Sequence, residues 1–343
     1  MKNVLYITIF ICLFAGCKKE PDLPAIATLP FENNYLRLEL VATSLPSFIR
    51  DIYFFNAATG IAVSYDGKIY RTIDGGVNWT IQFNNSTSDQ PFYQIYFSNA
   101  NVGYVVGGST NCYTPGCTPP GGLILKTVDG GNSWIRVLQQ PGVEFCSITS
   151  NNQGALFALS NGTTEGIFKS TDAGSTWTII SNLDAVPQKI NFIGDLGFCT
   201  GMKGHIFRST DAGTTWQLTT ILPANYATDI KMTNVSGYCI ADNQTVYKTS
   251  DKGDHWIQTY VHQNGTYVLN PLTVNNCIAF GAGVYSGGDF GTWSSEIMLT
   301  ENAGRDWSAT EIKEIEPIRY TSFYSASEGY AVAANKLVKI TVK

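Results

Sequence analysis

A short pattern, Ser/Thr-x-Asp-x-Gly-x-x-Trp, recurs six times along the chain and limits its fold more than any other feature of the sequence. Six of the seven tryptophans stand in its last position, at intervals of 55, 43, 39, 40 and 51 residues. The copies carry Asp74 and Trp79, Asp129 and Trp134, Asp172 and Trp177, Asp211 and Trp216, Asp251 and Trp256, and a degenerate Asn302 and Trp307. Repeats of this period indicate an array of similar units, each too small to bury its own apolar faces.

The residue types of the pattern are those of a tight turn between two strands. An aspartate can accept backbone N–H groups of the turn, glycine supplies a positive φ, and Ser or Thr adds a local hydrogen bond. The tryptophan covers the turn with apolar surface. We therefore interpret the five aspartates, and Asn302 in the sixth copy, as turn formers and not as catalytic groups.

Strand patterns surround each copy. An apolar run such as Ile69-Tyr70-Arg71 precedes the turn, and a short run such as Thr80–Phe83 follows it. Two further strands come earlier in each unit, for example Ile52–Phe54 and Gly60–Val63. Further copies of this first half begin near Ile95, Ile148, Ile190, Ile230, Leu272 and Thr321, which gives seven units. The sequence therefore predicts an all-β protein, a seven-bladed β-propeller of four-stranded antiparallel blades.

The last unit ends without a turn motif or a fourth strand. A segment with clean alternation, Tyr35–Leu40, stands alone near the start of the chain. We expect this N-terminal strand to become the outer strand of the seventh blade, because that pairing removes an exposed edge and closes the ring.

The repeated turn resembles the Asp box, or BNR repeat, of sialidases, sortilin-like receptors and photosystem II assembly factors. The sequence of residues 69–79, Ile-Tyr-Arg-Thr-Ile-Asp-Gly-Gly-x-x-Trp, is most similar to the repeats of the photosystem II stability and assembly factor family. That resemblance implies a seven-bladed, non-enzymatic binder of membrane-protein partners. It does not transfer the partner, and we infer no photosynthetic role from it.

The alternative is a glycan-cleaving hydrolase. Sialidases of this fold use three arginines, a Tyr supported by Glu, and an Asp, usually with a Phe-Arg-Ile-Pro-like segment that this chain lacks. Only seven arginines occur here. Xyloglucan-cleaving relatives place paired catalytic carboxylates in a cleft between two propellers, whereas this chain has room for only one propeller. We favour a binding scaffold, and a facing pair of carboxylates in the central bowl would favour the hydrolase.

The N-terminus reads as an export signal. An apolar run, Val4–Phe14, is too short to span a bilayer and leads into Ala15-Gly16-Cys17. This resembles a lipobox, so residues 1–16 are predicted to be a signal peptide and Cys17 the lipidated residue; an ordinary cysteine after a plain signal peptide is the alternative. Residues 17–33 would form a tether and 34–343 the propeller. We expect an outer-membrane lipoprotein, periplasmic or surface-exposed, attached to the membrane through its lipid alone.

Cysteines and charge limit the remaining chemistry. An exported chain meets an oxidising compartment, so Cys112 and Cys117, in a Gly/Pro-rich segment, are a candidate disulfide. The three histidines, His205, His255 and His262, are not spaced as metal ligands, and no cofactor motif is present. The chain has a net charge of -5 and no block of Lys and Arg residues, so it lacks the basic patch that nucleic acid requires. The predicted partner is an unidentified envelope protein or glycan, bound by a monomer without metal or cofactor.

Two insertions suggest where that partner binds. Residues 109–121 contain Tyr113, and residues 284–295 contain Tyr285, Phe290 and Trp293; both fall between the second and third strands of their blades and should rise from the face opposite the Asp boxes. Aromatic side chains on long loops suit a protein or glycan partner, although Trp293 could simply anchor its own loop. Arg50 and Arg319 begin the inner strands of the first and seventh blades, as an anion-attracting pair or as solvated rim charges.

Overall fold

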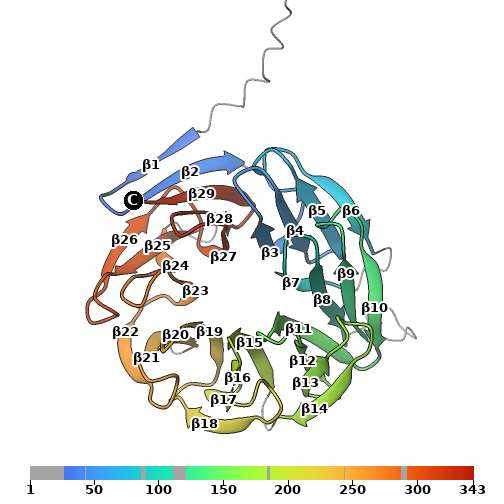
Figure 1. Cartoon of the computed structure of the whole chain (residues 1–343). Helices are drawn as coiled ribbons and strands as arrows, with labels where there is room; N and C mark the ends of the chain where they lie inside the picture. The colour runs from blue at the N-terminus through green and yellow to red at the C-terminus, as the bar shows by residue number, and fades with distance from the viewer. Residues whose placement is uncertain are drawn as a thin grey trace, which may run out of the picture.

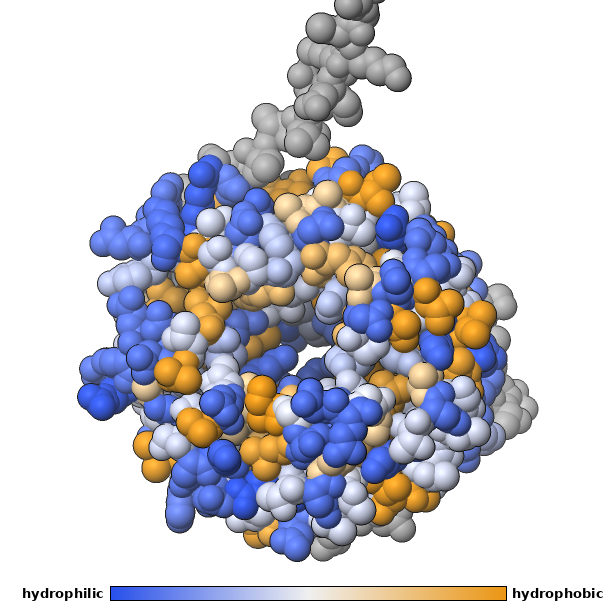
Figure 2. Space-filling model, in the orientation of Figure 1, coloured by the Kyte–Doolittle hydropathy of each residue, from blue (hydrophilic) through white to orange (hydrophobic). Residues whose placement is uncertain are grey.

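The protein is a seven-bladed β-propeller whose sheets are arranged in a ring (Figure 1). The space-filling view shows a channel open at the centre of this ring (Figure 2). The computed structural model describes residues 27–42, 44–85, 90–110, 121–183, 186–242, 244–286 and 292–343. Every regular element in these ranges is a β-strand, and no helix in them could span a membrane. The predicted fold class is therefore confirmed, with sheets formed by consecutive antiparallel strands as the repeats required.

Each blade contributes one inner strand to the channel wall. The inner strands are β3 (Ile49–Phe54), β7 (Phe92–Phe97), β11 (Val143–Ser150), β15 (Pro187–Ile193), β19 (Ala227–Thr233), β23 (Thr266–Pro271) and β27 (Ile318–Phe323). The second strands are β4 (Gly60–Ser64), β8 (Gly103–Ser109), β12 (Leu156–Gly162), β16 (Leu196–Gly201), β20 (Ser236–Ala241), β24 (Cys277–Ser286) and β28 (Glu328–Ala333). The sixth inner strand therefore ends before Leu272, near which we had expected it to begin, since its apolar run is Tyr267-Val268-Leu269.

The third and outer strands complete the blades. The third strands are β5 (Lys68–Thr72), β9 (Gly121–Thr127), β13 (Gly166–Ser170), β17 (His205–Ser209), β21 (Thr245–Thr249), β25 (Thr292–Thr300) and β29 (Lys336–Val342). The outer strands are β6 (Thr80–Asn84), β10 (Ile135–Gln140), β14 (Thr178–Asn182), β18 (Gln217–Ile221), β22 (Ile257–Val261), β26 (Ser308–Ile312) and β2 (Leu36–Ala42).

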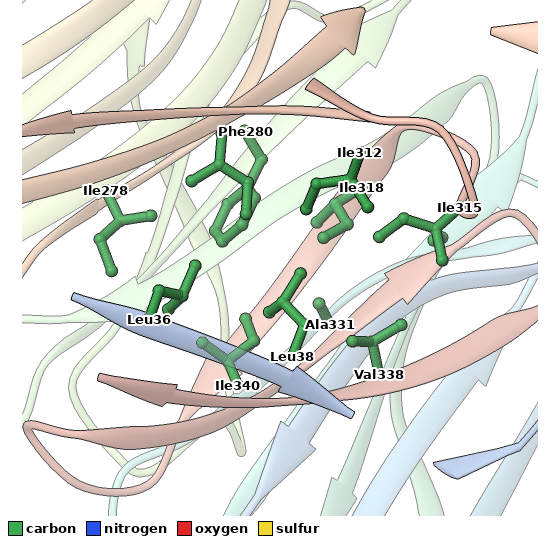
Figure 3. Packing of buried hydrophobic residues seen from close by; sticks show 12 residues of the cluster. Leu36, Leu38, Ile278, Phe280, Ile312, Ile315, Ile318, Ala331, Val338 and Ile340 are labelled. Atoms are coloured by element: carbon green, nitrogen blue, oxygen red, sulfur yellow. The ribbon is translucent and has the colours of Figure 1, made fainter. Parts of the chain in front are cut away.

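The seventh blade joins the two ends of the described chain. The N-terminal strand β2 pairs with the C-terminal strand β29, with Leu38 opposite Ile340. Both side chains are fully buried against Ile278 and Phe280 of the sixth blade (Figure 3). One more strand, β1 (Ala27–Glu32), pairs with the outer side of β2 and makes this a five-stranded sheet. This strand lies within the segment that we had assigned to the tether.

The Asp boxes form the turns between third and outer strands. In the first box the Thr72 hydroxyl donates to Asp74 Oδ1 at 2.8 Å, and the Asn78 N–H donates to the same oxygen at 2.9 Å. Equivalent bonds form at Asp129, Asp172, Asp211 and Asp251, and Asn302 Oδ1 accepts the N–H of Asp306 at 3.0 Å. The indole N–H donates to a glycine carbonyl for Trp79, Trp134 and Trp177, but has no partner for Trp216, Trp256 and Trp307 in the described structure.

Each box also packs against the preceding blade. Gly253 of the fifth box lies on Phe198, and Gly304 of the sixth lies on Tyr238. In the sixth blade, Ile278 takes the place of Phe198 and Tyr238. Each of these three residues pairs with the residue immediately before the box of its own blade, and for Ile278 that residue is Leu299. Because the seventh blade has no box, a cavity of about 360 Å³ lies at this position, lined in part by Ile278, Leu299 and Val342.

Candidate binding site

A β-bulge interrupts the start of every inner strand. The pairing of each inner strand with its neighbour skips one residue, for example between Ile49 and Asp51 and between Ile318 and Tyr320. The residues skipped, in blade order, are Arg50, Tyr93, Cys146, Gln188, Thr228, Tyr267 and Arg319. A bulge re-aims the side chain that it carries. In the first and second blades it leaves two successive residues partly exposed, before buried and partly exposed residues alternate again.

Arg50 and Arg319 therefore occupy equivalent positions on adjacent blades. Both line one cavity of about 770 Å³ between the seventh and first blades, together with Leu45, Phe48 and Val332. Arg319 is exposed and Arg50 is half-buried, and neither forms an ion pair with any described residue. We call this end of the channel the mouth; the Asp boxes lie at the opposite end of the strands.

Aromatic rings hold both guanidinium groups. The Arg319 guanidinium carbon lies 4.7 Å from the centroid of the Tyr267 ring, and that of Arg50 lies 5.3 Å from the Tyr93 ring. Arg50 also lies 5.9 Å from the Tyr65 ring. Contacts of this kind orient arginine without neutralising its charge. Four successive blades, the sixth, seventh, first and second, thus present a continuous arc of Tyr, Arg, Arg and Tyr.

Large apolar surface borders this arc. Phe48, in the link that leads into β3, is 82% exposed, and Tyr65, in the turn between β4 and β5, is 49% exposed. The link is fixed by a hydrogen bond of 2.7 Å from the Leu45 N–H to the Asn335 carbonyl. Exposed Phe, Tyr and Arg side chains side by side are the composition of binding hot spots in protein interfaces.

A carboxylate and a phenol form a second pair at the mouth. Tyr93 and Glu144 are close enough to influence each other's titration, and burial raises the pKa of both groups. Arg50 opposes that rise at both groups through its positive charge. Deeper in the channel, the Asp51 carboxylate accepts the N–H groups of Ile52 and Ile95, each at 3.0 Å, and burial raises its pKa as well.

Polar side chains of the inner strands also tie neighbouring blades together. Phe54 N–H donates to Ser322 Oγ at 2.8 Å, between the first and seventh blades. Ile148 N–H donates to Gln94 Oε1 at 2.8 Å, and Ile190 N–H donates to Ser147 Oγ at 3.3 Å. These bonds, with that from Ile95 to Asp51, make the wall beneath the mouth rigid, which a preorganised site requires.

The residues predicted on the long loops are placed only in part. Tyr113 and Phe290 lie outside the described residues, as do Cys17, Cys112 and Cys117. Tyr285 and Trp293 are backbone partners in the extended hairpin of β24 and β25, and their side chains are not described. Both loops leave the same end of the strands as the mouth, since they join second to third strands. The sequence did not reveal Tyr93, Tyr267, Phe48 or Tyr65, although Tyr93 and Tyr267 follow the same half-repeat as Arg50 and Arg319.

The histidines and cysteines in the described part of the chain are used in local contacts or buried in the core. His262 Nε2 lies 2.7 Å from Glu296 Oε2, and His262 Nδ1 accepts the Asn264 N–H at 3.3 Å, so both ring nitrogens are used. Cys199, Cys239 and Cys277 are buried free thiols, as expected for core residues, and Cys146 is half-buried. Within the described ranges no three His, Cys, Asp or Glu side chains are grouped as metal ligands.

The fold, the boxes and the mouth define an Asp-box propeller whose arginine-bearing face is separate from its structural turns. The chain belongs to the family of the photosynthesis system II assembly factor YCF48, whose model matches residues 32–180 and 143–270, more than half of the chain. No curated protein sequence matches this chain.

Solved structures share the fold at low sequence identity. A YCF48 structure with a D1 peptide bound is 18% identical, with a TM-score of 0.66, over 93% of this chain and 100% of that one. YCF48 from Cyanidioschyzon merolae is 14% identical, with a TM-score of 0.64, over 89% and 98%. The GH74 enzyme of Niastella koreensis is 17% identical, with a TM-score of 0.65, over 88% of this chain but 53% of its own. This chain thus spans about half of that enzyme.

Proposed function

We propose that this protein is a non-enzymatic binding or assembly factor of the cell envelope that holds a polypeptide partner at the mouth of its channel. The observation that carries this proposal is the arrangement of Arg50 and Arg319. Two guanidinium groups that form no ion pair with any described residue lie on equivalent bulges of adjacent blades, line one cavity, and are stacked on tyrosines. Such a site suits an anionic group flanked by apolar side chains.

Two features favour a polypeptide as the partner. The cavity has the size of a ligand pocket, and its apolar wall, formed by Leu45, Phe48 and Val332, can receive a side chain beside the anion. One YCF48 structure carries a bound D1 peptide. By family membership, a protein segment is therefore the expected ligand class, whereas the identity of that segment is not transferred.

The position of the N-terminus agrees with a partner at a membrane. Ala27 pairs with Leu40, which pairs with Val338, so β1 begins toward the end of the seventh blade that carries the mouth. Cys17, the proposed lipidated residue, is ten residues earlier. An extended tether of that length reaches about 35 Å at most. In this proposal the lipid keeps the mouth close to the surface of the outer membrane.

Affinity capture from cell envelopes tests this function. We expect wild-type protein to retain a specific partner that an Arg50→Gln, Arg319→Gln variant loses. The matched control is Arg37→Gln with Arg136→Gln, which makes the same charge change on the outer strands β2 and β10. A third variant, Tyr285→Ala with Trp293→Ala, measures the contribution of the long hairpin. Equal capture by wild type and the Arg50, Arg319 variant would refute the proposed site.

A glycan-cleaving hydrolase is the second candidate, and one observation favours it. Tyr93 and Glu144 interact electrostatically beside Arg50, which shares its cavity with Arg319, a combination similar to part of a sialidase site. Against it, burial raises the pKa of Tyr93, which weakens a phenol as a nucleophile, and Asp51 is engaged by two backbone N–H groups. A glycosidase screen decides: turnover that a Tyr93→Phe variant loses would replace the binding proposal.

A further inference from the structure

We propose that the channel beneath the mouth holds a second anion-binding subsite, formed by Lys189 and Lys231, which receives the continuation of an acidic polypeptide segment bound at Arg50 and Arg319. This inference rests on the proposed function and names the ligand class more closely. The segment would carry several carboxylates and would enter the channel instead of lying across it.

Both lysines belong to the channel wall. Lys189 follows the bulge residue Gln188 on β15, so it holds the place in the fourth blade that Asp51 holds in the first. Lys231 is two residues beyond Asp229 on β19, at the next partly exposed position of the fifth blade. Burial raises the pKa of Asp51, whereas the charges of Lys189 and Lys231 act across the channel to lower it. Both ammonium groups are therefore close enough to Asp51 to act on its carboxyl group.

The positive charge of the wall is not neutralised by ion pairs. Among the described residues, none of the four cations Arg50, Arg319, Lys189 and Lys231 takes part in one. Three carboxyl groups face these four cations: Glu144 at the mouth, Asp51, which accepts two backbone N–H groups, and Asp229, whose Oδ1 accepts the N–H of Ile230 at 2.9 Å. A channel with more cations than carboxylates concentrates anions, even though the whole chain has a net charge of -5.

The channel is accessible to such a ligand. Figure 2 shows it open at the centre of the ring, with mostly hydrophilic residues around the opening. Along the inner strands, Lys189 lies one residue beyond the bulge position Gln188, and Lys231 lies three residues beyond the bulge position Thr228. The two lysines therefore span depths of about 3 to 10 Å from the level of the arginines. An extended ligand therefore needs up to about three residues between the carboxylate at the mouth and the one at the lysines.

Peptide probes of two lengths separate the mouth from the channel. Fluorescence anisotropy with the purified full chain in detergent would use hexaglutamate, diglutamate and hexaglutamine labelled at one end. We expect hexaglutamate to bind and hexaglutamine not to bind. A Lys189→Gln, Lys231→Gln variant should weaken hexaglutamate about tenfold, which corresponds to about 1.4 kcal/mol. It should leave diglutamate, which reaches only the mouth, unchanged.

Controls make each outcome decisive. Lys252→Gln with Lys313→Gln removes the same charge from exposed sites and should change nothing, while Lys189→Arg with Lys231→Arg should keep the wild-type affinity. If hexaglutamate does not bind wild type, or binds the Lys189→Gln, Lys231→Gln variant equally well, the channel subsite is refuted. The mouth site is tested separately, by whether the Arg50→Gln, Arg319→Gln variant loses the captured partner.

Discussion

Leu38, near the start of the described chain, and Ile340, near its end, are backbone partners in one blade, and both side chains are fully buried. The ring is therefore closed by a strand that must be recruited from the opposite end of the sequence. Leu38→Ala removes apolar contacts from this closure, and we expect it to lower the free energy of unfolding by about 2–5 kcal/mol. Urea denaturation measures this. Arg37→Ala, on the same strand but with a partly exposed side chain that pairs with Glu39, is the control. Equal effects would show that the closure adds no special stability.

The position of the absent seventh box offers a stabilising change. Blades four and five carry Phe198 and Tyr238 where the sixth blade has Ile278 beside a cavity of about 360 Å³. We expect Ile278→Phe to fill part of that cavity and to stabilise the protein by about 0.5–2 kcal/mol.

The reverse change supplies the control for this prediction. Phe198→Ile removes apolar volume at a position that Gly253 already covers, so it should destabilise the protein. Thermal unfolding compares the two variants. A loss of stability in Ile278→Phe would mean that the phenyl side chain cannot fit into the cavity without strain, and that the cavity is not equivalent to an empty box position.

The box aspartates predict how stability depends on pH. Hydrogen bonds from the turn lower the pKa of Asp129, Asp172, Asp211 and Asp251 to about 2. An unfolded aspartate titrates near 3.9, so the folded state holds its proton less tightly. This stabilisation is complete above about pH 4 and is lost as the pH falls toward about 2. We expect the urea midpoint to drop across that interval.

Replacing those four aspartates by asparagine tests the cause of the pH dependence. The variant resembles the natural sixth box, where Asn302 accepts the same turn N–H. It should be less stable at pH 7 and should lose less stability on acidification than wild type. Glu165→Gln with Glu314→Gln, outside the boxes, should keep the wild-type profile. An unchanged slope in the asparagine variant would assign the acid sensitivity to other carboxylates.

The stacked tyrosines should matter less for binding than the arginines that they orient. Tyr267→Leu removes the ring beneath Arg319 but leaves the charge, so we expect partner affinity to fall about threefold, within the range of a cation–π contact. Tyr35→Leu, at the opposite end of the strands, should have no effect. Surface plasmon resonance with the captured partner measures both. A loss in Tyr267→Leu as large as that in Arg319→Gln would instead make the tyrosine a direct contact.

The sequence predicted the blades well because their signals are local. Each Asp box marks one hairpin, and the alternation of Tyr35–Leu40 predicted the closing strand. The sixth inner strand was misplaced at Leu272 because its apolar residues, Tyr267 to Leu269, lie next to a polar residue and a proline and form only a short run. The boxes were interpreted as structural, and their aspartates do accept turn N–H groups in the structure.

The site was less accessible to sequence reasoning. A bulge skips one residue and leaves no compositional mark, so Arg50 and Arg319 could be matched by position but not seen to share a cavity. Tyr93 and Tyr267 stand on the blades next to those of Arg50 and Arg319 in chain order, but the sequence does not show that the bulges aim all four side chains at one surface. The adjacency of Arg50 and Arg319 themselves follows from the closure of the ring, since they lie on the first and seventh blades.

Site-specific photo-crosslinking tests the central claim, that the partner binds at the mouth, most directly. A photoreactive phenylalanine analogue at Phe48, beside the arginine cavity, would be compared with one at Ile135, which is 62% exposed on the outer strand β10. Irradiation of intact envelopes should give a crosslinked partner from position 48 but not from position 135. The product should disappear in the Arg50→Gln, Arg319→Gln background. A partner crosslinked from position 135 alone, or one that persists without the two arginines, would contradict the account.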